Sequence, residues 1–214
     1  MVKLAIFDHD MTIVDSSYAI MAGFNYAARK IGLPEVSHEL TMQYIATPLP
    51  TFCEGLLGEY RPEWVKLYRE NIAEYERELI KPFPDTISTL TSLHDMGVKL
   101  AVVSNREYPE SALKNSGLAP YFDAIVGAEE PWGHLPYKPN PAMINALLEH
   151  MNISCNEAVY VGDADLDIVT AKAAHVRAIG ICTGNFSHHD FALLGAWKSI
   201  DTLSELVAIV QQDA

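Results

Sequence analysis

The sequence predicts an α/β fold with a doubly wound parallel sheet and a helical domain inserted after its first strand. Short runs rich in Val, Ile and Ala recur along the chain without polar alternation, which is typical of strands covered on both faces. They lie at 3–7, 98–104, 124–128, 158–162 and 176–181. Helical patterns separate most of these runs, and this order of elements favours right-handed crossover connections.

The first crossover is interrupted, because residues 15–81 contain no strand-like run and are too long for one ordinary connection. The first helix expected there carries apolar residues three or four positions apart: Ile20, Phe24, Ala27 and Ile31. A second helix is expected over 48–58, which begins with prolines and ends at Gly58, and a long amphipathic helix over 61–80. We therefore expect 15–81 to fold as a separate all-helical domain.

The remaining helices alternate with the later strands. We expect them over 84–97, where a periodic apolar pattern ends at a glycine, over 139–152, which opens with prolines, and over 166–175. Residues 1–14 and 82–214 would then form one Rossmann-like, three-layer α/β/α core around the parallel sheet.

The composition is that of an ordinary globular protein, with 214 residues of which 49% are hydrophobic and 20% charged. A formal net charge of −13 disfavours nucleic acids and anionic membranes as partners, because both would be repelled. The sequence contains no run of about 18 uncharged apolar residues, so no membrane span is expected. Its N-terminus becomes acidic at Asp8, too early for a signal peptide.

The cysteines support a cytoplasmic location. Cys53, Cys155 and Cys182 are odd in number, widely spaced and set among apolar neighbours, as expected of free thiols in a reducing compartment. None of them lies in a context typical of a catalytic nucleophile.

Polar side chains follow the expected strands, or begin the next helix, at the edge where ligands bind in open α/β sheets. They supply carboxylates, hydroxyls, an amide and an ammonium group: Asp8, Asp10, Thr12, Ser104, Asn105, Lys138, Asp163 and Asp167. Crowded carboxylates repel one another, and burying them is costly unless they share a cation. The sequence therefore predicts a metal-assisted site at this edge.

The group of side chains suits phosphoryl transfer with Mg²⁺, which takes oxygen ligands and keeps several waters. Asp8 and Asp163 would bind the ion, together with a backbone carbonyl near Asp10. The ion, the Lys138 ammonium and the Ser104 hydroxyl would surround the phosphoryl oxygens, whose negative charge must be stabilised. Asp8 would attack phosphorus to form an aspartyl phosphate, and Asp10 would move the protons.

Four motifs carry a family resemblance: DHDMT at 8–12, VVSN at 102–105, KPNP at 138–141 and GDADLD at 162–167. With them the chain resembles the haloacid dehalogenase superfamily, specifically its phosphoglycolate-phosphatase-like branch with a helical cap. The motifs span nearly the whole chain, and 15–81 lies where this branch has its cap. Agreement of all four motifs is specific, whereas any one alone would be weak.

The resemblance implies a phosphatase for a small phosphorylated metabolite, with no nucleic acid or membrane partner, present as a monomer or homodimer. It makes Asp8 the nucleophile and Asp10 the general acid/base. It assigns phosphate binding to Thr12, Ser104, Asn105 and Lys138. Of these, it makes Ser104 and Lys138 catalytic residues as well. It places Mg²⁺ on four carboxylates, the last in a supporting role: Asp8, Asp10, Asp163 and Asp167.

The chain also departs from the branch. A small apolar residue is usual where His9 stands, and glycine is usual where Met11 and His175 stand. The segment 131–137 ahead of Lys138 is longer than usual. None of these is a predicted catalytic residue, so the departures bear on the substrate rather than on the reaction. The cap is expected to close over the site with hinges near 13–17 and 80–84.

Other activities of the same superfamily differ in the residues that they need. Dehalogenation and phosphonate cleavage do not use a carboxylate at the Asp10 position, so both are disfavoured. A sugar-phosphate mutase resembling beta-phosphoglucomutase keeps Asp10 and is the main alternative, although 42–50 lacks the Arg or Lys expected to hold a second phosphate. A pyrophosphatase or nucleotidase also stays open. A non-catalytic binding module is disfavoured, because the set of catalytic residues is intact.

Three further groups of side chains are expected to have structural roles. His188, His189 and Asp190 suggest a metal site, but adjacent side chains point in different directions, which disfavours it. Asp165 is expected to cap a helix in solvent. Aromatic residues at near-helical spacing are expected to pack within the cap: Trp64, Tyr68 and Tyr75.

Overall fold

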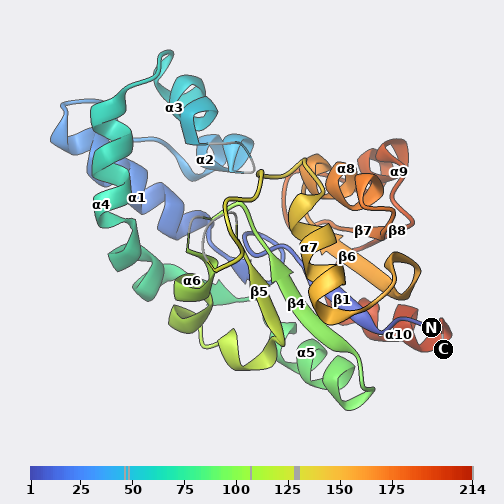
Figure 1. Cartoon of the computed structure of the whole chain (residues 1–214). Coiled ribbons are helices and arrows are strands. Elements are labelled where there is room, and N and C mark those ends of the chain that lie inside the picture. The colour runs from blue at the N-terminus through green and yellow to red at the C-terminus, as the bar shows by residue number, and fades with distance from the viewer. Residues whose placement is uncertain (46, 48, 107, 128–130, 214) are drawn as a thin grey trace. The chain divides into compact units, whose positions relative to one another are not determined.

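The computed structural model describes residues 1–45, 47, 49–106, 108–127 and 131–213 (Figure 1). Residues 46, 48 and 128, which fall in the predicted ranges 42–50, 48–58 and 124–128, lie outside the described residues. The chain divides into two compact units, one formed by Met1–Val14 with Pro82–Ala214 and the other by Asp15–Lys81. Two short strands pair where the chain passes between the units: β2 (Val14–Asp15) and β3 (Lys81–Pro82).

A parallel sheet of six strands organises the first unit, in the order β5–β4–β1–β6–β7–β8 (Figure 1). The strands are β1 (Leu4–Phe7), β4 (Lys99–Val103), β5 (Ala124–Val126), β6 (Ala158–Gly162), β7 (Arg177–Ile181) and β8 (Lys198–Ile200). The predicted α/β fold with a parallel sheet is confirmed. Five of the strands match the predicted runs, and β8 is additional, at the edge of the sheet.

Helices cover both faces of this sheet. They are α5 (Thr86–Asp95), α6 (Pro109–Asn115), α7 (Ala142–Met151), α8 (Asp165–Ala173), α9 (His188–Leu194) and α10 (Glu205–Gln212), with short 3₁₀ turns at Ala119–Tyr121 and Cys155–Glu157. Leu4 and Ile6 of β1 share a buried cluster with side chains of α7, α8 and α9. Alternate strand residues point to the other face, where α5 packs against β4 and α10 against α5 (Figure 1).

The second unit is helical: α1 (Ser17–Lys30), α2 (His38–Tyr44), α3 (Leu49–Leu57) and α4 (Pro62–Leu79). Aromatic rings lie at the centre of its core: Phe24 stacks on Trp64 with ring centroids 4.6 Å apart and meets Phe52 at a tilt, with centroids 3.9 Å apart. Asn25 closes the turn after α1, since its amide group donates to the Val36 carbonyl and accepts from the Val36 N–H. Among the described residues, no helix combines the length and apolarity needed to cross a membrane.

Candidate active site

The register of the central strands brings their carboxyl ends to one level. β1 pairs with β4 on one side and with β6 on the other, and the Asp8 N–H continues the ladder to the Val161 carbonyl at 2.9 Å. Asp8, Ser104 and Asp163 are each the first residue after their strand. Three segments that are far apart in sequence therefore deliver polar side chains to the same point of the sheet edge.

Lys138 connects two of the buried carboxylates. Its Nζ lies 2.8 Å from Asp8 Oδ1 and 2.7 Å from Asp167 Oδ1, and its side chain is 3% exposed. Burial alone would lower the pKa of this ammonium, but Asp167 and Asp8 together hold it well above its ordinary value. Lys138 is therefore a fixed positive charge within the cluster.

Tyr160 completes this network from the middle of β6. Its hydroxyl lies 3.2 Å from Lys138 Nζ, 3.0 Å from Asp167 Oδ1 and 3.3 Å from the Val103 carbonyl. Sequence reasoning missed Tyr160 because an aromatic residue in a buried strand is typical of the hydrophobic core. The only sequence signal was a phenol inside a run otherwise made of Ala, Val and Gly.

Three carboxylates crowd together beside the ammonium. One oxygen from each of Asp8, Asp163 and Asp167 lies within 4.8 Å of the others. Burial, and then the charges of Asp167 and Asp10, raise the pKa of Asp8 to about 7 against the attraction of Lys138. Burial, and then the charges of Asp167 and Asp8, also raise the pKa of Asp163 well above its ordinary value. Oxygen donors that repel one another in this way fit a hard divalent cation.

Two neighbours fix the Asp163 side chain. The Thr12 hydroxyl donates to Asp163 Oδ1 at 3.2 Å. On the other side Gly184 approaches so closely that a Cβ at this position would overlap the Asp163 carboxylate. Sequence reasoning singled out Thr12, but it did not predict the close approach of Gly184.

Asp10 forms a two-pronged ion pair with Arg106. The Arg106 Nε and Nη2 atoms donate to Asp10 Oδ2 and Oδ1, both at 2.6 Å. Burial alone would raise the pKa of Asp10, but the Arg106 guanidinium and then His9, whose Nδ1 lies 3.4 Å from Asp10 Oδ1, hold it well below its ordinary value. Arg106 was missed by sequence reasoning, although a cation directly after the VVSN motif was visible.

The two polar residues after β4 have different contacts. The Ser104 side chain is buried, and its Oγ accepts a hydrogen bond from the Arg106 N–H at 3.2 Å. The Asn105 amide holds the main chain of Lys138, accepting from its N–H at 2.7 Å and donating to its carbonyl at 3.3 Å. Asn105 thus positions the lysine, and its predicted contact with phosphate stays a prediction.

The sequence model of haloacid dehalogenase-like hydrolases matches residues 5–181. The chain belongs to this family. It is 32% identical to a phosphoglycolate phosphatase from Aquifex aeolicus, over 82% of each chain. It is 27% identical to one from Vibrio parahaemolyticus, over 100% of this chain and 98% of that one.

A solved structure shows the same fold. A Thermotoga maritima protein described as a candidate beta-phosphoglucomutase aligns with a TM-score of 0.78 over the whole of both chains, at 20% identity. Family and relatives together make this chain an enzyme, a phosphatase of the haloacid dehalogenase-like family.

The backbone explains two of the positions at which this phosphatase departs from the usual sequence of its branch. Met11 and His175 have φ angles of 55° and 57°, in the left-handed region that favours glycine. The Thr183 hydroxyl donates to the Met11 carbonyl and supports this turn. His9 is fully buried beside Asp10.

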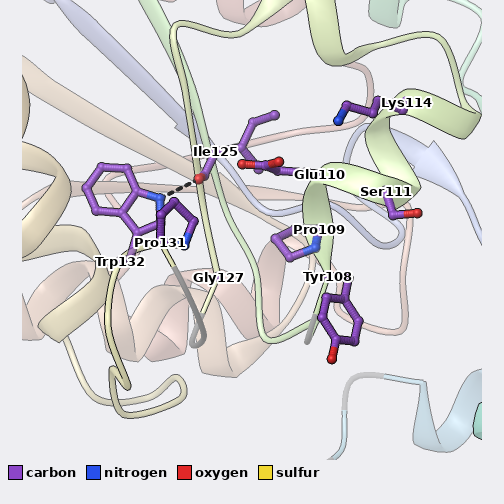
Figure 2. A pocket seen from close by; sticks show the side chains of 9 residues that line it. All are labelled: Tyr108, Pro109, Glu110, Ser111, Lys114, Ile125, Gly127, Pro131 and Trp132. Atoms are coloured by element: carbon purple, nitrogen blue, oxygen red, sulfur yellow. Dashed lines mark hydrogen bonds between the residues drawn. The ribbon is translucent and has the colours of Figure 1, made fainter.

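A separate cavity of about 240 Å³ lies beside α6 and β5 (Figure 2). Pro131 and Trp132 from the segment ahead of Lys138 line it, and the Trp132 Nε1–H donates to the Ile125 carbonyl at 2.6 Å. None of the predicted site residues lines this cavity. The departure at 131–137 therefore begins beside this cavity rather than at the carboxylates.

Proposed function

We propose that this phosphatase hydrolyses a small phosphate monoester resembling phosphoglycolate, with Mg²⁺, through an aspartyl phosphate on Asp8. The observation that carries the proposal is the setting of Asp8, which directly follows the central strand β1 and whose Oδ1 lies 2.8 Å from Lys138 Nζ. A second carboxylate, Asp10, stands two residues away, as two-step phosphoryl transfer requires. The names of the relatives support the choice of substrate class.

The chain's own residues divide the reaction between them. An Asp8 oxygen attacks phosphorus while the bond from phosphorus to the ester oxygen breaks, and the leaving alkoxide takes a proton from Asp10. Asp10 then removes a proton from the water that attacks the aspartyl phosphate, which releases inorganic phosphate and restores Asp8. Lys138 and Ser104 would bind phosphoryl oxygens, with Thr12 and Asn105 supporting the site.

Arg106 bears on the identity of the substrate. In the observed pair Asp10 is held ionised, whereas the first step needs Asp10 to carry a proton. We propose that the guanidinium leaves Asp10 when substrate binds and takes the substrate's second anionic group. Guanidinium groups bind carboxylates through two parallel hydrogen bonds, which favours a carboxylate-bearing ester such as phosphoglycolate.

The donor set fits Mg²⁺. Asp8, Asp163 and the main-chain carbonyl of Asp10 would hold it, with Asp167 in support, since the three carboxylates already crowd together. When bound, the ion would offset the mutual repulsion of the carboxylates and the charge on the phosphoryl oxygens.

The rest of the chain has a part in this proposal. The helical unit Asp15–Lys81 would act as the cap that shields the site from bulk water, moving about hinges near 13–17 and 80–84. The enzyme would work in the cytoplasm, as a monomer or homodimer, on a small phosphorylated metabolite.

The test is phosphate release from a panel of small phosphate esters, with and without Mg²⁺. Asp8→Asn should abolish turnover, and Asp10→Asn should reduce it by about 10²- to 10⁴-fold, the usual contribution of a general acid/base. A chelator should silence the wild type, and added Mg²⁺ should restore it. Turnover by Asp8→Asn at the wild-type rate would overturn the proposed nucleophile.

A mutase is the second candidate, because Asp10 is retained and the fold is shared with the Thermotoga protein. In that case the panel would stay silent, while a sugar phosphate would isomerise in the presence of a bisphosphate activator. Release of phosphate from pyrophosphate or nucleoside monophosphates, faster than from phosphoglycolate, would identify the pyrophosphatase or nucleotidase alternative.

A further inference from the structure

A second group of potential metal ligands stands at the carboxyl edge of the sheet, away from the central strands. It consists of Cys182 at the end of β7, His188 at the start of α9 and Asp201 at the end of β8 (Figure 1). One ligand atom from each residue lies within 4.8 Å of the other two. The cluster shares no residue with the site around Asp8.

Strand pairing brings the cysteine and the aspartate together. β7 pairs with β8 in parallel, and the Cys182 N–H extends that ladder to the Ile200 carbonyl at 2.9 Å. Cys182 and Asp201 therefore leave their strands side by side. Glu205 fixes the main chain of Asp201, since its Oε1 accepts from the Asp201 N–H at 2.9 Å.

The imidazole is already oriented for a ligand. His188 Nε2 lies 3.0 Å from Asp201 Oδ1, and its Nδ1 lies 2.7 Å from the Ser199 hydroxyl. Metal-binding histidines are commonly held in this way, by a hydrogen bond at the nitrogen that does not bind the metal. The helix start is fixed as well, because Asp190 accepts hydrogen bonds from the Ser187 N–H and hydroxyl at 2.9 and 2.6 Å.

The local charge attracts a cation. Asp201 belongs to the cluster, Glu205 accepts a hydrogen bond from the Asp201 N–H, and Asp190 lies in the first turn of α9 close to His188. A bound metal ion would favour the thiolate and lie between sulfur, nitrogen and oxygen donors.

We propose that Cys182, His188 and Asp201 form a binding site for a divalent transition-metal ion of the Zn²⁺ type. A thiolate, an imidazole and a carboxylate are the donors that Zn²⁺ uses, whereas Mg²⁺ prefers oxygen alone. With three protein ligands, the fourth position of a tetrahedral ion is left to water. The ion would tie together β7, α9 and β8 at the edge of the sheet.

The proposal is tested by titrating the whole reduced enzyme with Co²⁺, a spectroscopic substitute for Zn²⁺, at pH 8 with Mg²⁺ in excess. We expect a near-ultraviolet sulfur-to-cobalt band that saturates at one ion per chain and is reversed by Zn²⁺. Carboxylates give no such band, so the site around Asp8 does not contribute. Cys182→Ser should abolish the band, and Cys155→Ser, at the other half-buried thiol, should retain it.

Two further pairs of variants sharpen the assignment. His188→Gln should abolish or strongly weaken binding, whereas His189→Gln, one position along, should leave it unchanged. Ser199→Ala removes only the hydrogen bond that orients the imidazole, and it should weaken Co²⁺ binding by about 10- to 100-fold. A band that survives in Cys182→Ser, or one that disappears in Cys155→Ser, would overturn the proposal.

Alkylation of the unmodified enzyme provides a test that needs no variant. Zn²⁺ should slow the reaction of Cys182 with iodoacetamide by tenfold or more, as measured by peptide mass spectrometry, and should leave Cys155 unaffected. Equal rates at Cys182 with and without Zn²⁺ would show that no ion binds to the sulfur.

Discussion

At the scale of single residues, the proposed mechanism makes the contact between Asp10 and Arg106 a link between protonation of Asp10 and substrate binding. While the two hydrogen bonds at 2.6 Å persist, Asp10 is a poor proton donor, because its pKa is held well below the ordinary value. In the proposed mechanism, a substrate that draws the guanidinium away would also raise the pKa of Asp10, as acid catalysis needs. Binding of the correct substrate would thereby prepare the group that carries out the first step.

Removing the guanidinium should affect substrates unequally. For Arg106→Ala we expect KM for a carboxylate-bearing ester to rise by about 10- to 100-fold, the value of one charge-assisted hydrogen bond. For an ester without a carboxylate, KM should change little. Steady-state kinetics on the two esters measure the difference, with Lys114→Ala on α6 as the control for loss of a cation elsewhere. Equal effects on both esters would refute a role in recognising the second anionic group.

Ionisation of Asp8 should destabilise the metal-free protein. Its pKa is about 7 in the fold and 3.8 ordinarily, so between these values the folded state binds more protons than the unfolded state. Stability therefore falls as pH rises through this window and is constant on either side. Relative to Asp8→Asn, the unfolding free energy of the wild type should drop by up to about 4 kcal/mol, measured by urea denaturation with chelator present.

Asp123 provides a control of opposite sign. Burial would raise its pKa, but hydrogen bonds from Lys99 and the Leu100 N–H lower it, so its contribution is present at neutral pH and lost as pH falls below about 4. Asp123→Asn should thus cost stability at pH 7 and little at pH 3.

Saturating Mg²⁺ should remove the pH dependence of stability that is due to Asp8. A pH dependence unchanged by Mg²⁺ would argue against a cation shared by the carboxylates.

At the scale of elements, helices and strands with long hydrophobic patterns could be predicted from the sequence, and those with short patterns could not. The long periodic runs that became α4, α5 and α7 were visible in the sequence. β8 was missed because three residues, only one of them fully buried, make too short a pattern. The start of α9 carries a sequence signal for a helix, the capping box formed by Ser187 and Asp190. The adjacent histidines were instead considered as metal ligands, and the helix was not predicted.

The candidate site was predictable to the extent that its residues lie in motifs next to strand ends. Asp8, Ser104 and Asp163 could be placed at one edge because parallel strands align their carboxyl ends. Tyr160 and Arg106 could not, since their roles depend on which side chains meet across the sheet rather than on spacing. The same holds for Cys182 and Asp201, which are brought together only by the pairing of β7 with β8.

The end of α8 offers a test of backbone strain. His175 is exposed and follows the helix with a φ of 57°, where a residue with a Cβ is strained. His175→Gly should stabilise the protein by about 1 kcal/mol, a rise in Tm of about 2–4 °C by calorimetry. His175→Ala keeps the strained backbone and should bring no such gain; an equal gain in both variants would assign the effect to the imidazole.

At the scale of the whole molecule, the chain forms two hydrophobic cores, each built from different parts of the sequence. The helical unit is contributed by one continuous segment, 15–81, and its core packs aliphatic side chains around aromatic rings. The other unit is assembled from both ends of the chain around the sheet. Each core is therefore open to separate perturbation by a single substitution.

Truncating the fully buried Trp64 tests this separation. Trp64→Ala should destabilise the helical unit by about 3–5 kcal/mol, through the lost transfer energy and the cavity left behind. Hydrogen exchange followed by mass spectrometry should show that, relative to the wild type, exchange accelerates more in 15–81 than in the sheet. Ile168→Ala, a buried residue of α8, should produce the reverse pattern, and uniform loss of protection in both variants would mean that the units unfold as one.

The hold of Asn105 on the main chain of Lys138 has a consequence for how such enzymes diversify. The Asn105 amide holds both the N–H and the carbonyl of Lys138. The position of the ammonium therefore depends on this contact rather than on the segment that precedes Lys138. Residues can then be gained or lost between 131 and 137 while the lysine stays where it is. The length of this loop could therefore change beside an unchanged reaction centre, within the limits set by the packing of Trp132 and Leu135 on the core.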